Sequence, residues 1–291
     1  MSTPRPYPVT PLAPSASLAE AVRAHWREYV MEGTEIGTLM LSICLCGTLL
    51  YSSASPLQSL ALSRALRSLL MGTAIAMTTL LIMQSPFGRR SGAHCNPAVT
   101  LTFFWLARIH RWDAACYILA QFAGAVAGVL AARAILGVQL SAPPVRYVVT
   151  VPGQYGSLIA LVSEYLVSGL LMGIVLYASN HRRFARFTPM LVALLTILYF
   201  ALSSSIAGFS VNPARTFASA LCAWIWHGIW IYFFAPCLGM LTAAAIYIVS
   251  MGPNRVYCAK VFHDMRSPCP FPCQFKRLSQ DTALRADSLN L

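Results

Sequence analysis

Six long apolar runs, separated by short polar segments, make up most of the chain. They cover residues 29–51, 62–84, 114–136, 157–178, 189–205 and 228–250. Because an α-helix rises 1.5 Å per residue, about 20 apolar residues cross a hydrocarbon core of ~30 Å. The pattern therefore predicts an all-α membrane protein with six transmembrane helices.

Two shorter apolar runs, at residues 98–106 and 214–224, each follow the same tripeptide. The two copies are Asn96-Pro97-Ala98 and Asn212-Pro213-Ala214. Asn is a favourable N-cap and Pro a favourable first helical residue, so each copy predicts the start of a helix. A helix of about ten residues spans only half of the hydrocarbon core. We expect two re-entrant half-helices whose positive dipole ends face each other near the midplane.

The two halves of the chain look like an inverted repeat. The pattern Tyr-x-x-Ala-x-x-x-Gly occurs at residues 117–124 and again at residues 232–239, at equivalent distances after the two Asn-Pro-Ala copies. Glu32 in the first predicted span corresponds to Glu164 in the fourth. Each half contains three spans, an odd number, so the second half must be inverted in the membrane.

Composition and charge agree with this picture. The chain is 57% hydrophobic and 10% charged, whereas soluble domains carry about 25% charged residues. Sixteen of the 21 basic residues flank the spans on one side. Lys and Arg accumulate on cytoplasmic flanks, so both termini are predicted to be cytoplasmic, in a multi-pass protein of the cell membrane. This placement accounts for the net charge of +12 without nucleic-acid binding.

The chain resembles the aquaporin family, also called the major intrinsic proteins. The resemblance covers roughly residues 29–250 and rests on both Asn-Pro-Ala copies with their flanks, on Gln121 and Pro236, and on Glu32 and Glu164. It implies a right-handed bundle of six spans and two half-helices, assembled as a homotetramer with one pore per protomer. The implied function is passive passage of water, and of small neutral solutes such as glycerol, with exclusion of protons and ions.

Three segments follow from these patterns. Residues 1–28, rich in Pro and Ser, are expected to form a disordered cytoplasmic tail. Residues 29–251 form the channel domain. Residues 252–291 form a cytoplasmic tail that contains cysteines.

The resemblance assigns the pore to a few polar groups. Asn96 and Asn212 would each donate a hydrogen bond to a passing water. Arg215 is the only basic residue expected inside the fold, and a charge inside a membrane is by default a functional residue. It would belong to the selectivity filter at the outer mouth. The alternative is that Arg215 tethers loop carbonyls.

Further filter positions are expected at Phe209, at Phe200 or its neighbour Tyr199, and at Ile75 or its neighbour Ala76. Strict water channels of the family usually carry His at the Phe200 position, and glycerol-conducting members often carry an aromatic residue at the Phe209 position. The sequence therefore favours glycerol passage beside water. The alternative for each aromatic side chain is ordinary helix packing.

Glu32 and Glu164 are carboxylates in apolar spans. Irregular backbone inside a membrane must find its hydrogen bonds within the protein, so we expect each to brace a half-helix loop. The alternative is a proton relay. His94 is likewise expected to brace its loop.

Four residues after the last span, Cys258, His263, Cys269 and Cys273, are of the types that bind zinc. Their spacing matches no standard zinc finger, and free thiols or contact with the membrane surface are the alternatives. No other cofactor is expected.

Other functions are compatible with an inverted repeat. A coupled transporter would need ion sites at the midplane, and only the two glutamates qualify. A strictly water-selective channel or a junction protein with a closed pore are further alternatives. An enzyme is not expected, because no nucleophile–base pair or nucleotide-binding loop is present.

Overall fold

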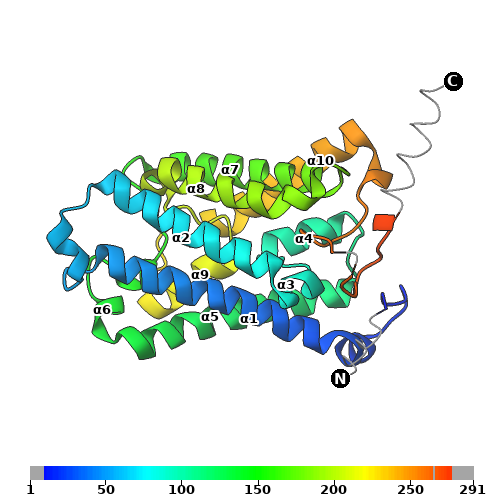
Figure 1. Cartoon of the computed structure of the whole chain (residues 1–291), viewed down its shortest axis with the longest axis horizontal. Coiled ribbons are helices and arrows are strands. Elements are labelled where there is room, and N and C mark those ends of the chain that lie inside the picture. Colours follow the sequence, from blue (N-terminus) through cyan, green and yellow to red (C-terminus); the bar gives the residue numbers. More distant parts are fainter. Residues whose placement is uncertain (1–9, 265, 277–291) are drawn as a thin grey trace.

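The computed structural model describes residues 10–264 and 266–276, leaving aside the side chains of residues 203–205. Six long helices form a bundle (Figure 1). They are α1 (Leu18–Tyr51), α2 (Arg64–Gln84), α5 (Arg111–Leu136), α7 (Gly156–Ser179), α8 (Thr188–Ala207) and α10 (Ile229–Met251). All six are long and apolar enough to cross a membrane. The prediction of six spans is confirmed.

Shorter elements connect the long helices. The α-helical ones are α3 (Pro86–Ser91), α4 (Pro97–Trp105), α6 (Val138–Ser141) and α9 (Pro213–Ala223). The 3₁₀ turns are η1 (Pro56–Leu60), η2 (Arg146–Val148), η3 (Ala185–Phe187) and η4 (Pro253–Arg255). Helices α4 and α9 are the two half-helices, and each lies within one residue of its predicted bounds.

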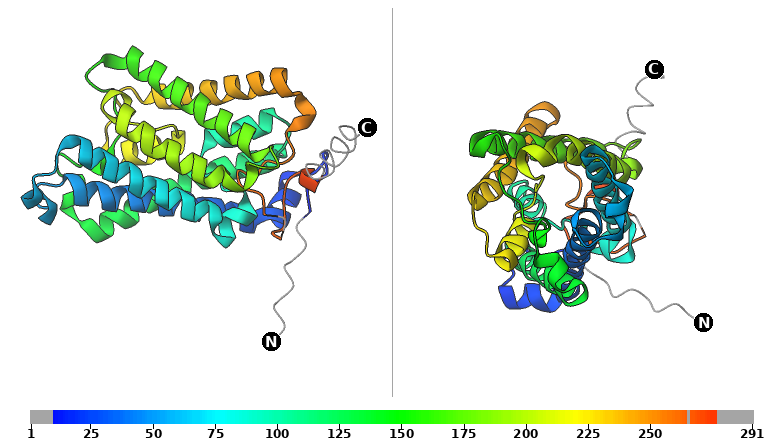
Figure 2. Two further views of the ribbon diagram at one scale, coloured as in Figure 1. Left: turned by 45° about the horizontal axis from the view of Figure 1, so that its top comes forward. Right: turned by 90° about the vertical axis from the view of Figure 1, so that its left-hand side faces the viewer.

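The half-helices lie between the long helices rather than on the surface. In Figure 1, α4 and α9 are sandwiched between α7, α8 and α10 on one side and α1 and α5 on the other. Each contacts both α5 and α10, and the two contact each other. The end-on view in Figure 2 shows the long helices arranged around this central region.

In both halves of the chain, a glycine at a helix–helix contact allows close packing. Helix α1 packs against α5, and α7 packs against α10. A Cβ atom on Gly124 would lie 2.0 Å from the carbonyl oxygen of Gly33, and one on Gly239 would lie 2.2 Å from the carbonyl oxygen of Tyr165. Small residues let helix backbones approach closely in membranes. Gly124 and Gly239 both end the repeated Tyr-x-x-Ala-x-x-x-Gly pattern.

The N-terminal boundary differs from the prediction. Helix α1 begins at Leu18, so residues 18–28, expected to be part of a disordered tail, are helical. Ser17 and Glu20 form a reciprocal capping box that fixes this start. The added turns are also held internally, because the His25 ring lies 2.9 Å from Asp113 and the Tyr29 hydroxyl donates to the same carboxylate at 2.6 Å.

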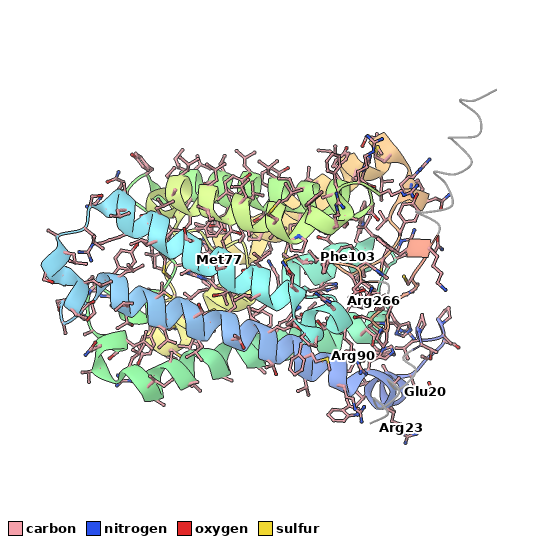
Figure 3. The ribbon with its side chains drawn as sticks, viewed as in Figure 1. Glu20, Arg23, Met77, Arg90, Phe103 and Arg266 are labelled. Atoms are coloured by element: carbon pink, nitrogen blue, oxygen red, sulfur yellow. The ribbon has the colours of Figure 1, made fainter. Side chains whose placement is uncertain are left out.

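The C-terminal segment also differs from a free tail. Residues 256–261 and Phe271 are buried in the core at one end of the bundle, where Figure 1 shows the orange and red chain passing beside α4 and α3. Figure 3 shows the labelled basic residues Arg23, Arg90 and Arg266 at this same end.

The glycine contacts give a test of the packing. Gly124→Ala should destabilise the protein by about 1–3 kcal/mol, the usual cost of overpacking a tight core. Gly173→Ala on α7 is the matched control, because nothing lies within 4 Å of the point that its new Cβ atom would occupy and Ala favours a helix. Thermal unfolding of both purified variants checks this, and equal unfolding temperatures would contradict it.

Candidate pore and selectivity site

Two loops enter the bundle from opposite ends and meet at Asn96 and Asn212. The Asn96 Oδ1 atom accepts from the N–H of Ala98 at 2.9 Å, and the Asn212 Oδ1 atom accepts from the N–H of Ala214 at 3.1 Å. Each side-chain oxygen thus caps its own half-helix. The side-chain nitrogens are therefore the groups that face the other half of the protein.

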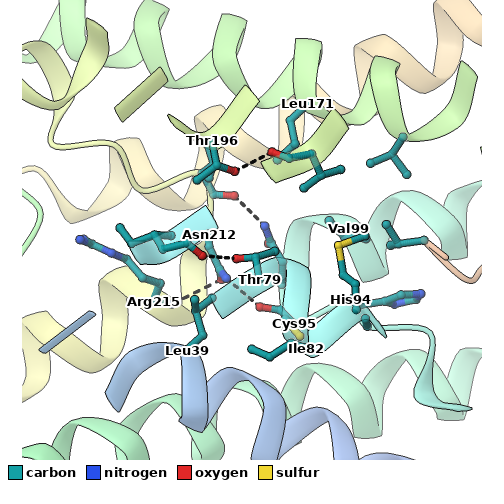
Figure 4. Close-up of a pocket in the computed structure, with 18 of the residues that line it drawn as sticks. Leu39, Thr79, Ile82, His94, Cys95, Val99, Leu171, Thr196, Asn212 and Arg215 are labelled. Carbon is teal, nitrogen blue, oxygen red and sulfur yellow. Dashed lines mark hydrogen bonds between the residues drawn. The ribbon is translucent and has the colours of Figure 1, made fainter. Parts of the chain in front are cut away.

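Each Asn amide also reaches across to the opposite loop. The Asn96 Nδ2 atom donates to the carbonyl oxygen of Val211, and the Asn212 Nδ2 atom donates to that of Cys95, both at 2.7 Å. Figure 4 shows the second of these bonds. A primary amide has two N–H donors. One donor on each Asn therefore links the two halves, and the second is available to a solute.

The loops hold an unusual backbone conformation. Residues one and three positions before each Asn have positive φ: 52° at Ala93, 48° at Cys95, 53° at Phe209 and 49° at Val211. Left-handed conformations of non-glycine residues cost of order 1–3 kcal/mol each. The same two positions are strained in both halves, so the surrounding structure must hold both loops in the same way.

Two buried carboxylates hold these loops. Glu32 on α1 accepts from the backbone N–H groups of His94 and Cys95, both at 2.8 Å. Glu164 on α7 accepts from those of residues 210 and 211, both at 2.7 Å. Gln121, from the repeated pattern, donates to Glu32 at 2.9 Å. Every carboxylate oxygen of the pair is thus engaged with a loop.

His94 connects its loop to two other segments. Its Nδ1 atom lies 3.0 Å from the Thr100 hydroxyl, and its Nε2 atom lies 2.8 Å from the carbonyl oxygen of Ala259. Its ring stacks on Phe103 and on Phe271, with centroids 5.2 and 5.6 Å away. The ring is therefore packed between the half-helix and the C-terminal segment.

A cavity of about 120 Å³ runs past these loops. One water needs roughly 10–15 Å³ of cavity volume, so there is space for several. Its wall includes Asn96, Asn212, Arg215, Phe209 and Ile75, and also His94 and Val261. Figure 4 shows Arg215 and Asn212 toward one end, Cys95 between, and His94 toward the other.

The predicted filter residues divide into two groups. Arg215, Phe209 and Ile75 line the cavity. Phe200 and Tyr199 do not, and their rings instead pack against Phe209 with centroids 5.7 and 6.5 Å away. Both side chains pack against the Phe209 ring, so a direct filter role for either stays a prediction.

Arg215 lies almost wholly inside the protein, with 5% of its surface exposed. Its backbone N–H donates to the Asn212 side chain at 3.4 Å. Its Nη1 atom is buried and has no hydrogen-bond partner among the described residues. A buried guanidinium donor without a protein acceptor is suited to bind a polar solute in the cavity.

The sequence analysis did not single out two further glutamates on α1, Glu28 and Glu35. Glu28 accepts from the Arg90 Nε atom at 2.7 Å, and Glu35 accepts from the Ser91 hydroxyl at 2.8 Å. The spacing of residues 28, 32 and 35 places them on one helical face, a signal visible in the sequence. They tie α1 to α3 beside the first loop.

The four C-terminal candidates for metal binding lie together. The ligand atoms of Cys258, His263, Cys269 and Cys273 are all within 4.8 Å of one another. Lys260 is buried beside them, and burial lowers the pKa of its ammonium group, whereas the charges of ionised neighbouring thiols act in the opposite direction.

The sequence over this fold matches a known family. A model of the major intrinsic protein family matches residues 20–247, more than three quarters of the chain. The chain belongs to the major intrinsic protein family. This confirms the resemblance drawn from the two Asn-Pro-Ala copies.

Several relatives are aquaporins. Aquaporin Z of Rhodopseudomonas palustris is 28% identical over 76% of this chain and 93% of its own length. A probable aquaporin NIP-type of Nicotiana alata is 32% identical, but the match spans only 57% of this chain and 60% of that relative. The aquaglyceroporin structure from Plasmodium falciparum superimposes with a TM-score of 0.63 at 20% identity, over 79% of this chain and 98% of that one.

The carboxylate braces give a second test. Glu164→Gln replaces an acceptor oxygen by an NH₂ group, so one loop N–H loses its partner, at a cost of about 1–3 kcal/mol. We expect a lower unfolding temperature and a lower yield of folded protein. Glu20→Gln is the matched control, because Gln also completes a capping box. A Glu164→Gln protein as stable as the control would show that the brace is dispensable.

Proposed function

We propose that this protein is a passive membrane channel for water and for small uncharged solutes such as glycerol, and that it excludes protons and ions. The observation that carries the proposal is the row of donors along the cavity: the free amide hydrogens of Asn96 and Asn212, then the guanidinium of Arg215. Aquaporin-type channels as a class exclude protons and cations with half-helix dipoles and an Arg.

The donors also account for proton exclusion in this chain. A water whose oxygen accepts from the two Asn amides points its hydrogens outward along the pore. It cannot then accept a proton from one neighbour while donating to the next. The proton wire is interrupted at the midplane, where the positive ends of α4 and α9 also meet.

A coupled transporter is less well supported. Such a transporter needs coordinating groups for an ion at the midplane. The four oxygens of Glu32 and Glu164 already accept four backbone N–H groups. These carboxylates therefore accept hydrogen bonds from the loops and are not available to coordinate a coupling ion.

We further propose that the protein lies in the cell membrane with both termini in the cytoplasm. The basic residues labelled in Figure 3 gather at the end that holds the start of α1 and the C-terminal segment, as the positive-inside rule requires for a cytoplasmic face. The family relationship supports a homotetramer with one pore per protomer.

Solute choice is tested by stopped-flow swelling of proteoliposomes in water and glycerol gradients. Phe209 and Ile75 leave the filter less polar than a filter with His would be, so both fluxes should exceed those of protein-free vesicles. The rings of Phe200 and Tyr199 pack against Phe209. This packing favours a narrower pore that conducts water alone, which is the second candidate function. Water flux with glycerol at the lipid background would select that strictly water-conducting form.

The role of Arg215 is tested by paired water and proton fluxes. At an effective dielectric near 20, two unit charges 4 Å apart repel by about 4 kcal/mol, which is close to a thousandfold in rate. Arg215→Val should therefore keep water flux within a few-fold and admit protons. Arg215→Lys is the matched control that keeps the charge and should stay nearly proton-tight. An Arg215→Val channel that conducts water without a proton leak would assign the exclusion to the half-helix dipoles.

A further inference from the structure

We propose that Cys258, His263, Cys269 and Cys273 bind a zinc ion, and that this ion holds residues 256–264 and 266–275 across the cytoplasmic mouth of the pore in a closed position. The zinc site stands on its own geometry. The closure rests on the proposed channel function.

The ligand atoms are already arranged as a closed metal site. The sulfur atoms of Cys258 and Cys269 are 3.5 Å apart, and the His263 Nε2 atom is 3.1 Å from the sulfur of Cys273. A tetrahedral zinc centre separates two sulfurs by about 3.8 Å and a sulfur from a nitrogen by about 3.5 Å. The observed separations are a few tenths of an ångström shorter. Three sulfurs and one imidazole fill all four positions, as in structural zinc sites.

The charge of such a centre is balanced locally. Zinc with three thiolates carries a net charge of −1, and a buried charge needs a partner. Lys260 is 1% exposed and follows Cys258 by two residues. Its ammonium donates to the carbonyl oxygens of Arg89 and Pro268. The same side chain thus balances the site and joins it to α3.

The segment is fastened to the first pore loop. The N–H of Val261 donates to the carbonyl oxygen of Gly92 at 3.1 Å, and the carbonyl oxygen of Ala259 lies 2.8 Å from His94 Nε2. The Phe271 ring stacks on His94 with an interplanar angle of 7°. Two parts of the metal-binding segment therefore contact the residues that precede Asn96.

The segment occupies the middle of the bundle end. Val256, Cys258, Ala259, Val261 and Phe271 belong to one buried core cluster. That cluster also takes residues from seven helices around it: Tyr29 (α1), Met83 (α2), Phe103 (α4), Tyr117 (α5), Val175 (α7), Val192 (α8) and Tyr247 (α10). Of the segment's buried residues named above, Val261 is the one that lines the cavity, beside Met83, Val175 and Val192 from the helices. An apolar side chain thus ends the row of polar groups at this mouth.

Zinc would control how firmly the segment stays in place. The described residues between 256 and 275 form short turns and no long helix of their own. In such small units the free energy of metal binding is free energy of folding. Loss of the ion would leave the anchoring contacts without the cross-link between Cys258 and Cys273, and the mouth would open.

The metal is tested on the full-length protein purified under reducing conditions. Elemental analysis should find about one zinc per chain in the wild type, the content of a four-ligand structural site. The double variant Cys258→Ser/Cys269→Ser should lose the metal, and Cys46→Ser, which changes a cysteine on α1, should keep it. Less than about a tenth of an equivalent in the wild type would overturn the site.

The closure is tested by water flux of the same full-length proteins in vesicles. A membrane-permeant zinc chelator should raise the wild-type flux about tenfold, the change expected if the clamped form keeps roughly nine-tenths of the pores closed. The double variant should be fast with or without chelator. Cys46→Ser should behave as the wild type. Chelation guards against a folding defect in the variant, because it uses the unaltered chain.

The outcomes separate the two proposals. Flux above the lipid background that chelation leaves unchanged would overturn the closure and leave the channel function standing. Flux at the lipid background in every form would contradict the channel function and the closure together, while the zinc content would still decide the metal site.

Discussion

The structure depends on how two irregular loops are kept inside a membrane. Backbone N–H groups in hydrocarbon have no water to bond, so each unmade bond is costly. Glu32 and Glu164 supply four acceptor oxygens for the four N–H groups that precede Asn96 and Asn212. The free energy of these bonds offsets the cost of the positive φ angles in the same loops. The same bonds hold the backbone in place at the start of each half-helix inside the bundle.

The chemistry of the pore follows from that placement. Once the loops are fixed, the Asn amides can cap their own helices, bond the opposite loop and still offer one hydrogen each to the cavity. Arg215 sits three residues after Asn212, in the first turn of α9, and so reaches the same cavity. The first loop has an additional role, because His94 and Gly92 also hold the C-terminal segment. The residues proposed for selectivity and for closure therefore adjoin one another.

The six spans and the two half-helices could be predicted from the sequence, because both depend on signals between neighbouring residues. The six spans follow from long apolar runs, and the half-helices were placed within one residue because Asn and Pro mark helix starts. The burial of the C-terminal segment was not predicted, because it depends on contacts with residues far earlier in the chain. Ala259, for example, contacts His94, which lies 165 positions before it. The start of α1 was missed although Ser17 and Glu20 are a readable capping signal. The filter position on α8 was left open between Phe200 and Tyr199, because chain spacing does not specify which face of the helix meets the cavity.

The central claim is that water crosses through this cavity and not through the lipid. The most direct measurement is the temperature dependence of osmotic water flux in vesicles that contain the metal-free protein. Water in a pore lined by hydrogen-bond donors need not dissolve in hydrocarbon, so the activation energy should fall well below that of protein-free vesicles and approach that of diffusion in bulk water. An activation energy equal to that of the protein-free vesicles would contradict the account.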